Sequence, residues 1–447
     1  MKKIVFTTLF LVGALLTNAQ YNSLGLYNPH FTFNKAEFIP SKLGTNKSRV
    51  EFRALPNAFV YAGNSLMPIN DILYPTTSGI DKAINEANNS SRFGAAGEIP
   101  FLAISYRVGK TKELMTFSFS NKTRVLANTV LGDNLLKLIW NGNKQFEGQT
   151  VDLGKFRANS FAATQINLGW AMPIEIGSKT LRIGSNLKYL LGVAGASISE
   201  TTPKLTTETG GKSVAFSNLD YRADMADPDE NNTFLGSGFA IDLSATYSFT
   251  DEINASLAIL DIGSIGFSEN TKSYSGNGNF TFEGLVIDNI FNDYTIDLDS
   301  VLRADVNTEG DSNQTFSVGL PTRLVAHVEK NITNGEAYTK HGIYLTYIQG
   351  FNNNAGTTTK PYFAAGYSYS LNDILNVGST ANYGGYSGFG LGMFMSVKAG
   401  PFRIGAGSNS GLSYLLFPRS AKSVDFSFMT TWSIGKGTTK ISAPSIN

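Results

Sequence analysis

The sequence predicts an all-β fold, namely a 14-stranded antiparallel transmembrane β-barrel with an N-terminal plug-like segment and short periplasmic turns. Three observations predict it: an N-terminal export signal, a recurring period-two alternation of apolar and polar residues, and links that alternate between short and long. The 45 Gly, 31 Phe and 19 Tyr, with only 16% charged residues, are typical of a large antiparallel β-protein. No segment after the signal has the long apolar run of a transmembrane helix.

Residues 1–19 predict a secretory signal peptide that is cleaved after Ala19. Two N-terminal lysines precede an apolar run that ends at Leu16, and small residues stand before the cleavage point. Removal of these lysines changes the formal net charge from +1 to −1, which leaves no basic surface for nucleic acid. Because the chain has no Cys, a lipid-modified cysteine, a disulfide and a thiolate metal site are all excluded.

Residues 20–48 follow the signal and predict a plug-like segment, since they are rich in Asn and Phe and poor in strand pattern. Fourteen strands enclose a lumen that is too wide for wall side chains alone to fill, so either a channel or an ordered plug is needed. Proline fixes its own backbone and biases the preceding residue toward an extended form, so the segment should have a defined shape. The candidate plug residues are Tyr27, Asn28, Pro29, Phe31 and Phe33.

The barrel strands are predicted from alternation, which in a strand places successive side chains on opposite faces. In 239–249, for example, six apolar residues alternate with polar residues such as Asp242 and Ser244. Most segments of this kind are near the length of about 9–11 residues that a tilted strand needs to cross a bilayer. They are 49–62, 100–109, 113–125, 160–172, 179–192, 238–249, 252–263, 321–331, 340–350, 361–371, 374–384, 388–399, 402–410 and 422–435, so that the barrel spans 49–435 and 436–447 form a periplasmic tail.

The links between these segments alternate in length, as in barrels with short periplasmic turns and longer extracellular loops, and the short link 385–387 is the one weak exception. The long links include 63–99, 193–237 and 264–320, and both termini are then expected on the periplasmic side. A soluble β-sandwich or propeller is the alternative, but its loops need not alternate in length, and the chain has no blade-length repeat. Within the long links we expect a short helix at 133–140 and a second hairpin at 272–287.

Polar residues on the inward face of the strands are the candidate site residues. Opposite charges across a lumen are expected to pair and brace the barrel rather than to form an ion-selective ring. The histidine among them is expected to hydrogen-bond to a neighbour, with a Ser–His–Asn hydrolase arrangement as the alternative. Nucleophile-elbow, phosphate-loop and His-Glu-x-x-His patterns are missing, so we expect neither an enzyme nor a cofactor or metal site. The candidate lumen-facing residues are Arg107, Arg182, Lys188, Asp242, His327, Glu329 and Lys398.

An ordered set of segments carries a resemblance over nearly the whole mature chain. These segments are LLKLIWNGN at 135–143, GFAIDL at 238–243, LDIG at 260–263, NFTFEG at 279–284, LPT at 320–322 and PRSAK at 418–422. Together they resemble a family of outer-membrane proteins of unknown function in Bacteroidota. The strand count and Tyr27-Asn28-Pro29 also resemble fatty-acid-transporter-like barrels, in which an N-terminal segment folds into the lumen as a plug. The chain departs from that pattern at His30, where a small residue is usual, and it lacks their small-residue-rich N-terminal helix.

Two functions from different classes follow from this prediction. The first is a channel in the bacterial outer membrane for small or apolar substrates. The second is a non-conducting barrel that serves as a subunit or scaffold of a larger outer-membrane complex. The expected partners are outer-membrane lipids and other outer-membrane or periplasmic proteins, and not nucleic acid.

Overall fold

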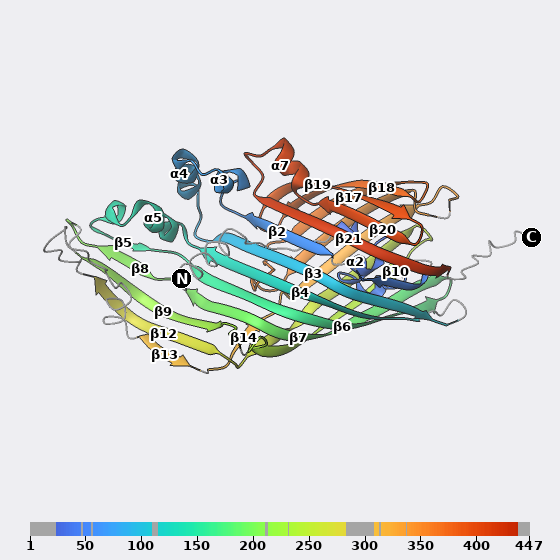
Figure 1. Cartoon of the computed structure of the whole chain (residues 1–447). Coiled ribbons are helices and arrows are strands. Elements are labelled where there is room, and N and C mark those ends of the chain that lie inside the picture. Colours follow the sequence, from blue (N-terminus) through green and yellow to red (C-terminus); the bar gives the residue numbers. More distant parts are fainter. Residues whose placement is uncertain are drawn as a thin grey trace, which may run out of the picture.

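The wall of the molecule is a closed antiparallel β-barrel (Figure 1). The computed structural model describes residues 24–45, 48–54, 57–109, 115–210, 213–230, 232–282, 308–312, 314–336 and 338–436. Within these residues, 14 strands follow one another around the wall, and the last of them pairs with the first. The predicted 14-stranded antiparallel β-barrel is therefore confirmed.

Every predicted strand segment is present in the wall. The first wall strand is interrupted and consists of β1 (Ser48–Arg53) and β2 (Ala58–Asn64), which both pair with the strands on either side. Another interrupted strand consists of β14 (Phe316–Gly319) and β15 (Arg323–Ile332), which both pair with β11. The other wall strands are β3 (Ser91–Val108), β4 (Met115–Leu131), β6 (Phe156–Ile176), β7 (Lys179–Thr201), β10 (Gly236–Ser248), β11 (Ile253–Phe267), β16 (His341–Gly350), β17 (Tyr362–Leu371), β18 (Leu375–Gly384), β19 (Gly388–Ala399), β20 (Phe402–Ser408) and β21 (Ser423–Lys436).

The two ends of the barrel differ, and we call them the short-turn end and the long-loop end. At the short-turn end, strands are joined by tight links such as 372–374, where Asn372 and Asp373 adopt positive φ values of 49° and 54°. Asn and Asp tolerate this left-handed backbone better than other non-glycine residues, so the sequence favours a turn there. The long-loop end carries α3 (Ile69–Leu73), α4 (Thr77–Asn85), α5 (Asp133–Asn141), η3 (Lys144–Phe146) and α7 (Gly411–Leu416).

A second group of strands extends the sheet at the long-loop end, at the left of Figure 1. It consists of β5 (Gln149–Asp152), β8 (Lys204–Thr207), β9 (Val214–Ala226), β12 (Thr271–Phe282) and β13 (Thr308–Ser312). The helix predicted at 133–140 is confirmed as α5. The hairpin predicted at 272–287 is wrong within the described residues, because β12 is one continuous strand that pairs with β9 and β13. Residues 283–287 of that prediction lie outside the described residues.

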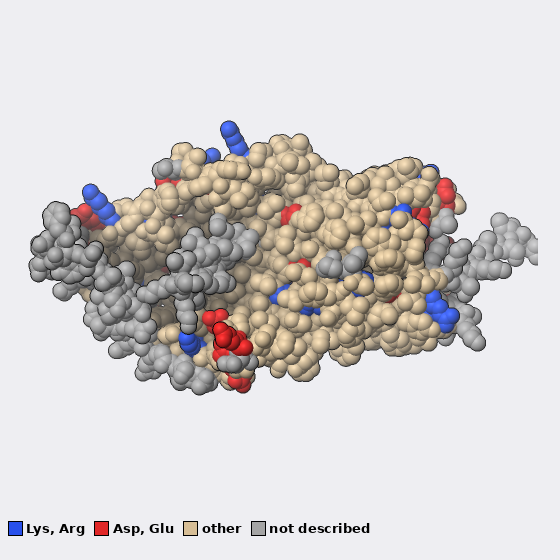
Figure 2. All heavy atoms as spheres, in the orientation of Figure 1, with Lys and Arg blue, Asp and Glu red and all other residues tan. Residues whose placement is uncertain are grey.

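The outer face of the wall is apolar. Alternate residues such as Phe239, Leu257 and Leu345 expose their side chains outward, and Figure 2 shows most of this face without charged groups. A closed barrel pairs every backbone group of its strands, which makes it one of the two structures that can lie in hydrocarbon. The apolar wall and the closed sheet together identify the chain as an outer-membrane β-barrel.

Among the described helices, none is long and apolar enough to cross a membrane.

Candidate functional site: the lumen

Residues 24–45, which we call the N-terminal segment, lie inside the barrel. The segment contains η1 (Leu24–Leu26), α2 (Thr32–Ala36) and η2 (Pro40–Lys42), and most of its side chains are buried. Asn28 Nδ2 donates to Ser396 Oγ on β19 at 3.2 Å, whereas the backbone N–H of Ser41 donates to Ser244 Oγ on β10 at 2.6 Å. Since β10 and β19 lie on opposite sides of the closed wall, the segment crosses the lumen.

The backbone of the segment is held by side chains of the wall. Its helical turns are short, so several carbonyls need donors from elsewhere, because buried backbone groups are almost always paired. Arg182 on β7 donates from Nε to Ser41 O at 3.0 Å and from Nη2 to Leu43 O at 2.7 Å, and Arg107 on β3 donates to Gly44 O. Two residues predicted to face the lumen therefore bind the end of the segment.

A buried group of charges, the Glu329 cluster, joins the segment to β15. Lys35 Nζ lies 3.0 Å from Glu329 Oε2, and Lys42 Nζ lies 2.6 Å from Glu329 Oε1. Burial lowers the pKa of Lys42, and the nearby Glu329 carboxylate opposes that shift. His327 Nε2 lies 3.7 Å from Glu329 Oε2, while its Nδ1 lies 2.9 Å from Thr346 Oγ1. One carboxylate thus holds two ammonium groups of the segment, and His327 is a hydrogen-bonded histidine beside it.

A second buried group, the Asp261 network, crosses the middle of the lumen. Asp261 on β11 accepts two hydrogen bonds from the Arg124 guanidinium, at 3.1 and 3.2 Å, and one from Lys188 Nζ at 2.7 Å. Arg323 Nη2 lies 3.7 Å from the same carboxylate, and Lys188 also contacts Asp242 at 2.7 Å. Strands β4, β7, β10, β11 and β15 are therefore tied together by side chains that are almost wholly buried.

The Asp261 network also reaches the N-terminal segment. Arg124 Nε lies 2.9 Å from Glu98, and Lys122 Nζ bridges Glu98 at 2.8 Å and Glu37 of the segment at 3.0 Å. Burial raises the pKa of Glu37, but the charges of Lys122 and Arg53 lower it by more, so its net shift is downward. Glu37 accordingly keeps its charge and anchors the segment to β4 and β1.

Above this network, toward the long-loop end, the inner face of the wall becomes apolar. Phe161, Leu190 and Phe267 are buried on the inward faces of β6, β7 and β11. Gly195 leaves the space that Phe267 fills, since a Cβ there would lie 2.5 Å from the Phe267 ring. These side chains belong to one contact cluster that also contains Tyr27, Phe31 and Phe38 of the N-terminal segment. Apolar contact is therefore continuous from the segment to the upper lumen.

The loop 351–361 also folds inward, at the long-loop end. Its residues Thr357 and Thr358 have no exposed surface. The Tyr386 hydroxyl lies 2.8 Å from Asn128 Oδ1 of β4 and 2.7 Å from Thr357 O. Gly356, at φ 83°, lies so close to β4 that a Cβ there would be 2.8 Å from Leu126 Cδ1. The sequence contained a weak signal for this loop, because the run 352–354 is three successive asparagines, which favour side-chain-capped turns.

The predicted site residues occupy several environments. The structure places Arg107, Arg182, Lys188, Asp242, His327 and Glu329 in the contacts described above. Lys398 instead lies at the rim of the short-turn end, where its 39% exposed side chain contacts Asp373 at 2.5 Å. Of the candidate plug residues, Tyr27, Asn28, Phe31 and Phe33 are buried, and Pro29 is half-buried. Among the described residues, no group of three or more His, Asp or Glu could hold a metal ion.

Most residues of the Asp261 network were not predicted from the sequence as site residues. Lys122 and Arg124 had a signal, because they are spaced by two residues on one face of a predicted strand. Glu98 lies at the end of what was predicted as a loop, and β3 begins earlier, at Ser91. Asp261 was hidden by an irregularity in β11, where the register against β10 shifts.

His30 is expected to make docking of the N-terminal segment pH-dependent. Its Nε2 lies 3.3 Å from Ser370 Oγ and its Nδ1 lies 3.7 Å from Asp373. Burial, followed by the Arg403 charge, lowers its pKa from 6.5 to about 3, although Asp373 opposes the shift; Lys35 and Lys398 also lower it. An undocked His30 takes up a proton below pH 6.5 and a docked one does not, so docking weakens as the pH falls from 6.5 toward 3.

This expectation can be measured by hydrogen exchange of residues 24–45 at pH 7 and pH 5, corrected for the intrinsic effect of pH on exchange. Protection of the segment should be lower at pH 5 in the native chain. The variant His30→Gln can hydrogen-bond to Ser370 but does not titrate, so its loss of protection at pH 5 should be smaller than that of the native chain. An equal loss in both proteins would contradict the role of His30.

The chain matches one protein family and is similar to several solved structures. Residues 43–409 match a family described as "Family of unknown function (DUF5723)". Among solved structures, the chain is similar to the TodX monoaromatic hydrocarbon channel deltaS2 mutant, with 9% identity, a TM-score of 0.47 and coverage of 90% of this chain and 94% of that one. It is similar to the Ralstonia pickettii toluene transporter TbuX, with 12% identity, a TM-score of 0.40 and coverage of 90% and 93%. It is also similar to a Pseudomonas aeruginosa FadL homologue, with 10% identity, a TM-score of 0.44 and coverage of 94% and 100%. A comparison with curated proteins found no match.

Proposed function

For a chain that belongs to DUF5723, a family of unknown function, we propose the role of a gated outer-membrane channel for small apolar molecules. In this proposal the N-terminal segment is the plug that closes the channel at rest. One observation carries the proposal. The buried apolar side chains form a single contact cluster that runs from Phe267 and Phe316 in the upper lumen to Tyr27 and Phe31 in the N-terminal segment.

The apolar inner face supports the choice of substrate. The interior of an outer-membrane barrel is ordinarily polar and wet. Here Phe161, Leu190 and Ile265 point inward and are buried, so water in this part of the lumen would be unfavourable. A small apolar solute would replace those contacts when the filling elements move aside. The charged middle of the lumen would be a barrier that ions and polar solutes cross less readily.

The contacts of the N-terminal segment support a gate. The segment is held by ion pairs and hydrogen bonds, and each of these groups could be hydrated if the segment left. Closure by such contacts is reversible in principle, because no covalent bond has to break. Loss of the Glu329 charge would weaken closure most, because Lys35 and Lys42 both pair with this single carboxylate.

A non-conducting scaffold is the second candidate, and the inward-folded loop 351–361 favours it. This loop fills the long-loop end independently of the N-terminal segment, through Tyr386, Asn128 and Gly356. If the loop alone keeps the lumen shut, removal of the segment changes nothing. The two candidates therefore predict different behaviour for one truncated protein.

The test is deletion of residues 24–45 in the otherwise complete chain. We expect the native barrel to be closed in planar bilayers and the deletion variant to conduct, with faster entry of the apolar dye N-phenyl-1-naphthylamine into cells that carry it. Glu329→Gln should open the barrel part of the time, because Lys35 and Lys42 lose their counter-charge. Glu336 is an exposed carboxylate at the short-turn end, so Glu336→Gln is the matched control. The barrel of this variant should stay closed. A deletion variant that folds but remains closed would favour the scaffold.

A further inference from the structure

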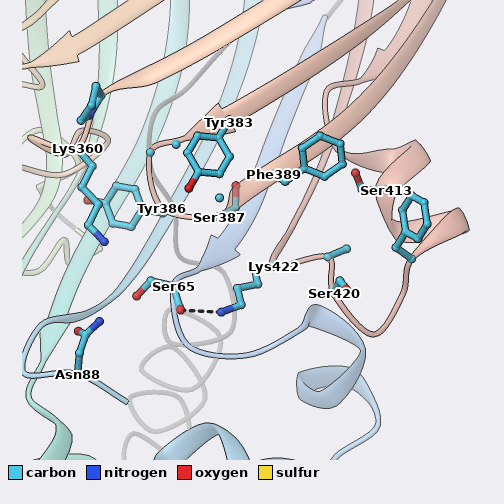
Figure 3. A pocket seen from close by; sticks show the side chains of 16 residues that line it. Ser65, Asn88, Lys360, Tyr383, Tyr386, Ser387, Phe389, Ser413, Ser420 and Lys422 are labelled. Carbon is cyan, nitrogen blue, oxygen red and sulfur yellow. Dashed lines mark hydrogen bonds between the residues drawn. The ribbon is translucent and has the colours of Figure 1, made fainter. Parts of the chain in front are cut away.

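A cavity of about 740 Å³ lies at the long-loop end, beside the inward-folded loop 351–361 (Figure 3). It is formed by the end of the loop 351–361, the turn between β18 and β19, the segment after α7 and the link before β3. Lys360 and Lys422 line it, together with serine hydroxyls such as Ser387. Aromatic rings of Tyr383 and Phe389 form its edge. Of the described residues that line this cavity, none is acidic.

The two lysines of this cavity have no carboxylate partner in the cavity lining. Lys422 Nζ donates to the backbone carbonyls of Ser65 at 3.0 Å, drawn as the dashed line in Figure 3, and of Leu66 at 3.3 Å. Lys360 Nζ has no hydrogen-bond partner in the part of the chain that the structure describes. Burial, followed by the charges of Arg92 and Lys422, lowers the pKa of Lys360. The charges of Arg92 and Lys422 therefore repel the Lys360 ammonium, and an anion bound beside Lys360 would relieve that repulsion.

A second hollow adjoins the first on the outer face of the wall. It is a groove of about 520 Å³ over β15 to β19, lined by outward apolar side chains such as Leu345, Phe363 and Ala365. Tyr383 and Phe389 line both the groove and the cavity, so the two hollows meet at these rings. The combined site has a cationic end beside the loops and an apolar end against the membrane-facing wall.

We propose that this combined site binds a membrane lipid with an anionic phosphate head group. The phosphate would lie between Lys360 and Lys422, and an acyl chain would lie in the groove along Phe363 and Ala365. Tyr383 and Phe389 stand at the junction, and aromatic side chains in this position are typical of the boundary between head groups and hydrocarbon. The positive charges of Lys360 and Lys422 favour an anionic head group. The apolar groove favours a lipid with an acyl chain over a free anion. This inference holds whether or not the lumen conducts.

The binding experiment uses the full barrel in dodecyl maltoside, titrated with phosphatidylglycerol and followed by native mass spectrometry. Phosphatidylcholine with the same acyl chains tests the charge, and inorganic phosphate tests the head group alone. We expect one tightly bound phosphatidylglycerol, preferred over phosphatidylcholine by about fivefold or more, since one basic residue near anionic lipid gives about that factor. Lys360→Gln should remove most of this preference, whereas Lys82→Gln, an exposed lysine of α4 at the same end, should leave it unchanged.

The groove is tested separately with Ala365→Trp, which should weaken the binding of both lipids because the ring fills the space of the acyl chain. Ala381→Trp, also in the groove, is the second variant if the first does not fold. Equal binding of the two lipids by the native barrel would overturn the proposal, as would an unchanged preference in Lys360→Gln. Displacement of the lipid by inorganic phosphate, combined with normal lipid binding in both tryptophan variants, would show a free-phosphate site and would also overturn it.

Discussion

Asp261→Asn is expected to lower the free energy of unfolding by about 3–5 kcal/mol, because it removes the one charge that Arg124, Lys188 and Arg323 share. Desolvation of a buried cation is costly when its partner is lost, and all three cations are almost wholly buried. Lys188 keeps Asp242 and Arg124 keeps Glu98, so both of these cations retain one carboxylate after the substitution.

Asparagine is chosen because it isolates the charge. Asp261 has a φ of 54°, in the left-handed region that Asn tolerates and most other residues do not. Its backbone N–H donates to Asp242 Oδ1 at 2.7 Å, and the substitution leaves that bond intact. The loss can be measured by urea titration of barrels folded into phosphatidylcholine vesicles, followed by tryptophan fluorescence.

The matched control is Asp251→Asn, an exposed carboxylate in the turn between β10 and β11. Surface substitutions of this kind change stability by about 0.5 kcal/mol or less. If Asp261→Asn and Asp251→Asn shift the urea midpoint equally, the Asp261 network does not brace the barrel. A large loss in Asp261→Asn alone would mean that the network stabilises the wall.

The wall was predictable from the sequence because its strands face two different media. Lipid on one side and a largely polar interior on the other impose an alternation that is readable residue by residue, as in β10 and β21. The start of β3 was missed because residues 94–97 are Gly, Ala, Ala and Gly, which show no such contrast. The long-loop sheet was missed because β12 pairs with β9, which is remote from it in sequence.

The Asp261 network shows why much of the site was not predictable. With an unbroken alternation from Leu257 through Ile259, Asp261 would point outward into lipid. The register of β10 against β11 shifts at this point, and the positive φ of Asp261 turns its side chain into the lumen instead. The inward fold of the loop 351–361 is likewise set by contacts with distant strands, since Asn353 accepts a hydrogen bond from Arg92 on β3. Neither the inward direction of the Asp261 side chain nor the inward fold of this loop can be predicted from the local sequence pattern.

Leu243→Arg should destabilise the barrel by about 2–4 kcal/mol, the range for a cation on the lipid face near the bilayer midplane. Leu243 is 47% exposed on the outer face of β10 and lies well inside the strand, between Ile259 of β11 and Ser185 of β7. An arginine there must either desolvate its charge in hydrocarbon or draw water and head groups inward, and both cost free energy. The same urea titration in vesicles measures the loss.

Phe249→Arg is the matched control, because Phe249 is also exposed but follows the last residue of β10 at the short-turn end. Near the membrane surface an arginine costs only about 0–1 kcal/mol, since its charge can reach water. We therefore expect a clear difference between the two positions, and Leu257→Arg on β11 should resemble Leu243→Arg. Equal losses at residues 243 and 249 would contradict the assignment of this band to the hydrocarbon core. A loss only at residue 249 would require the barrel to lie at a different height in the membrane, with the short-turn end buried.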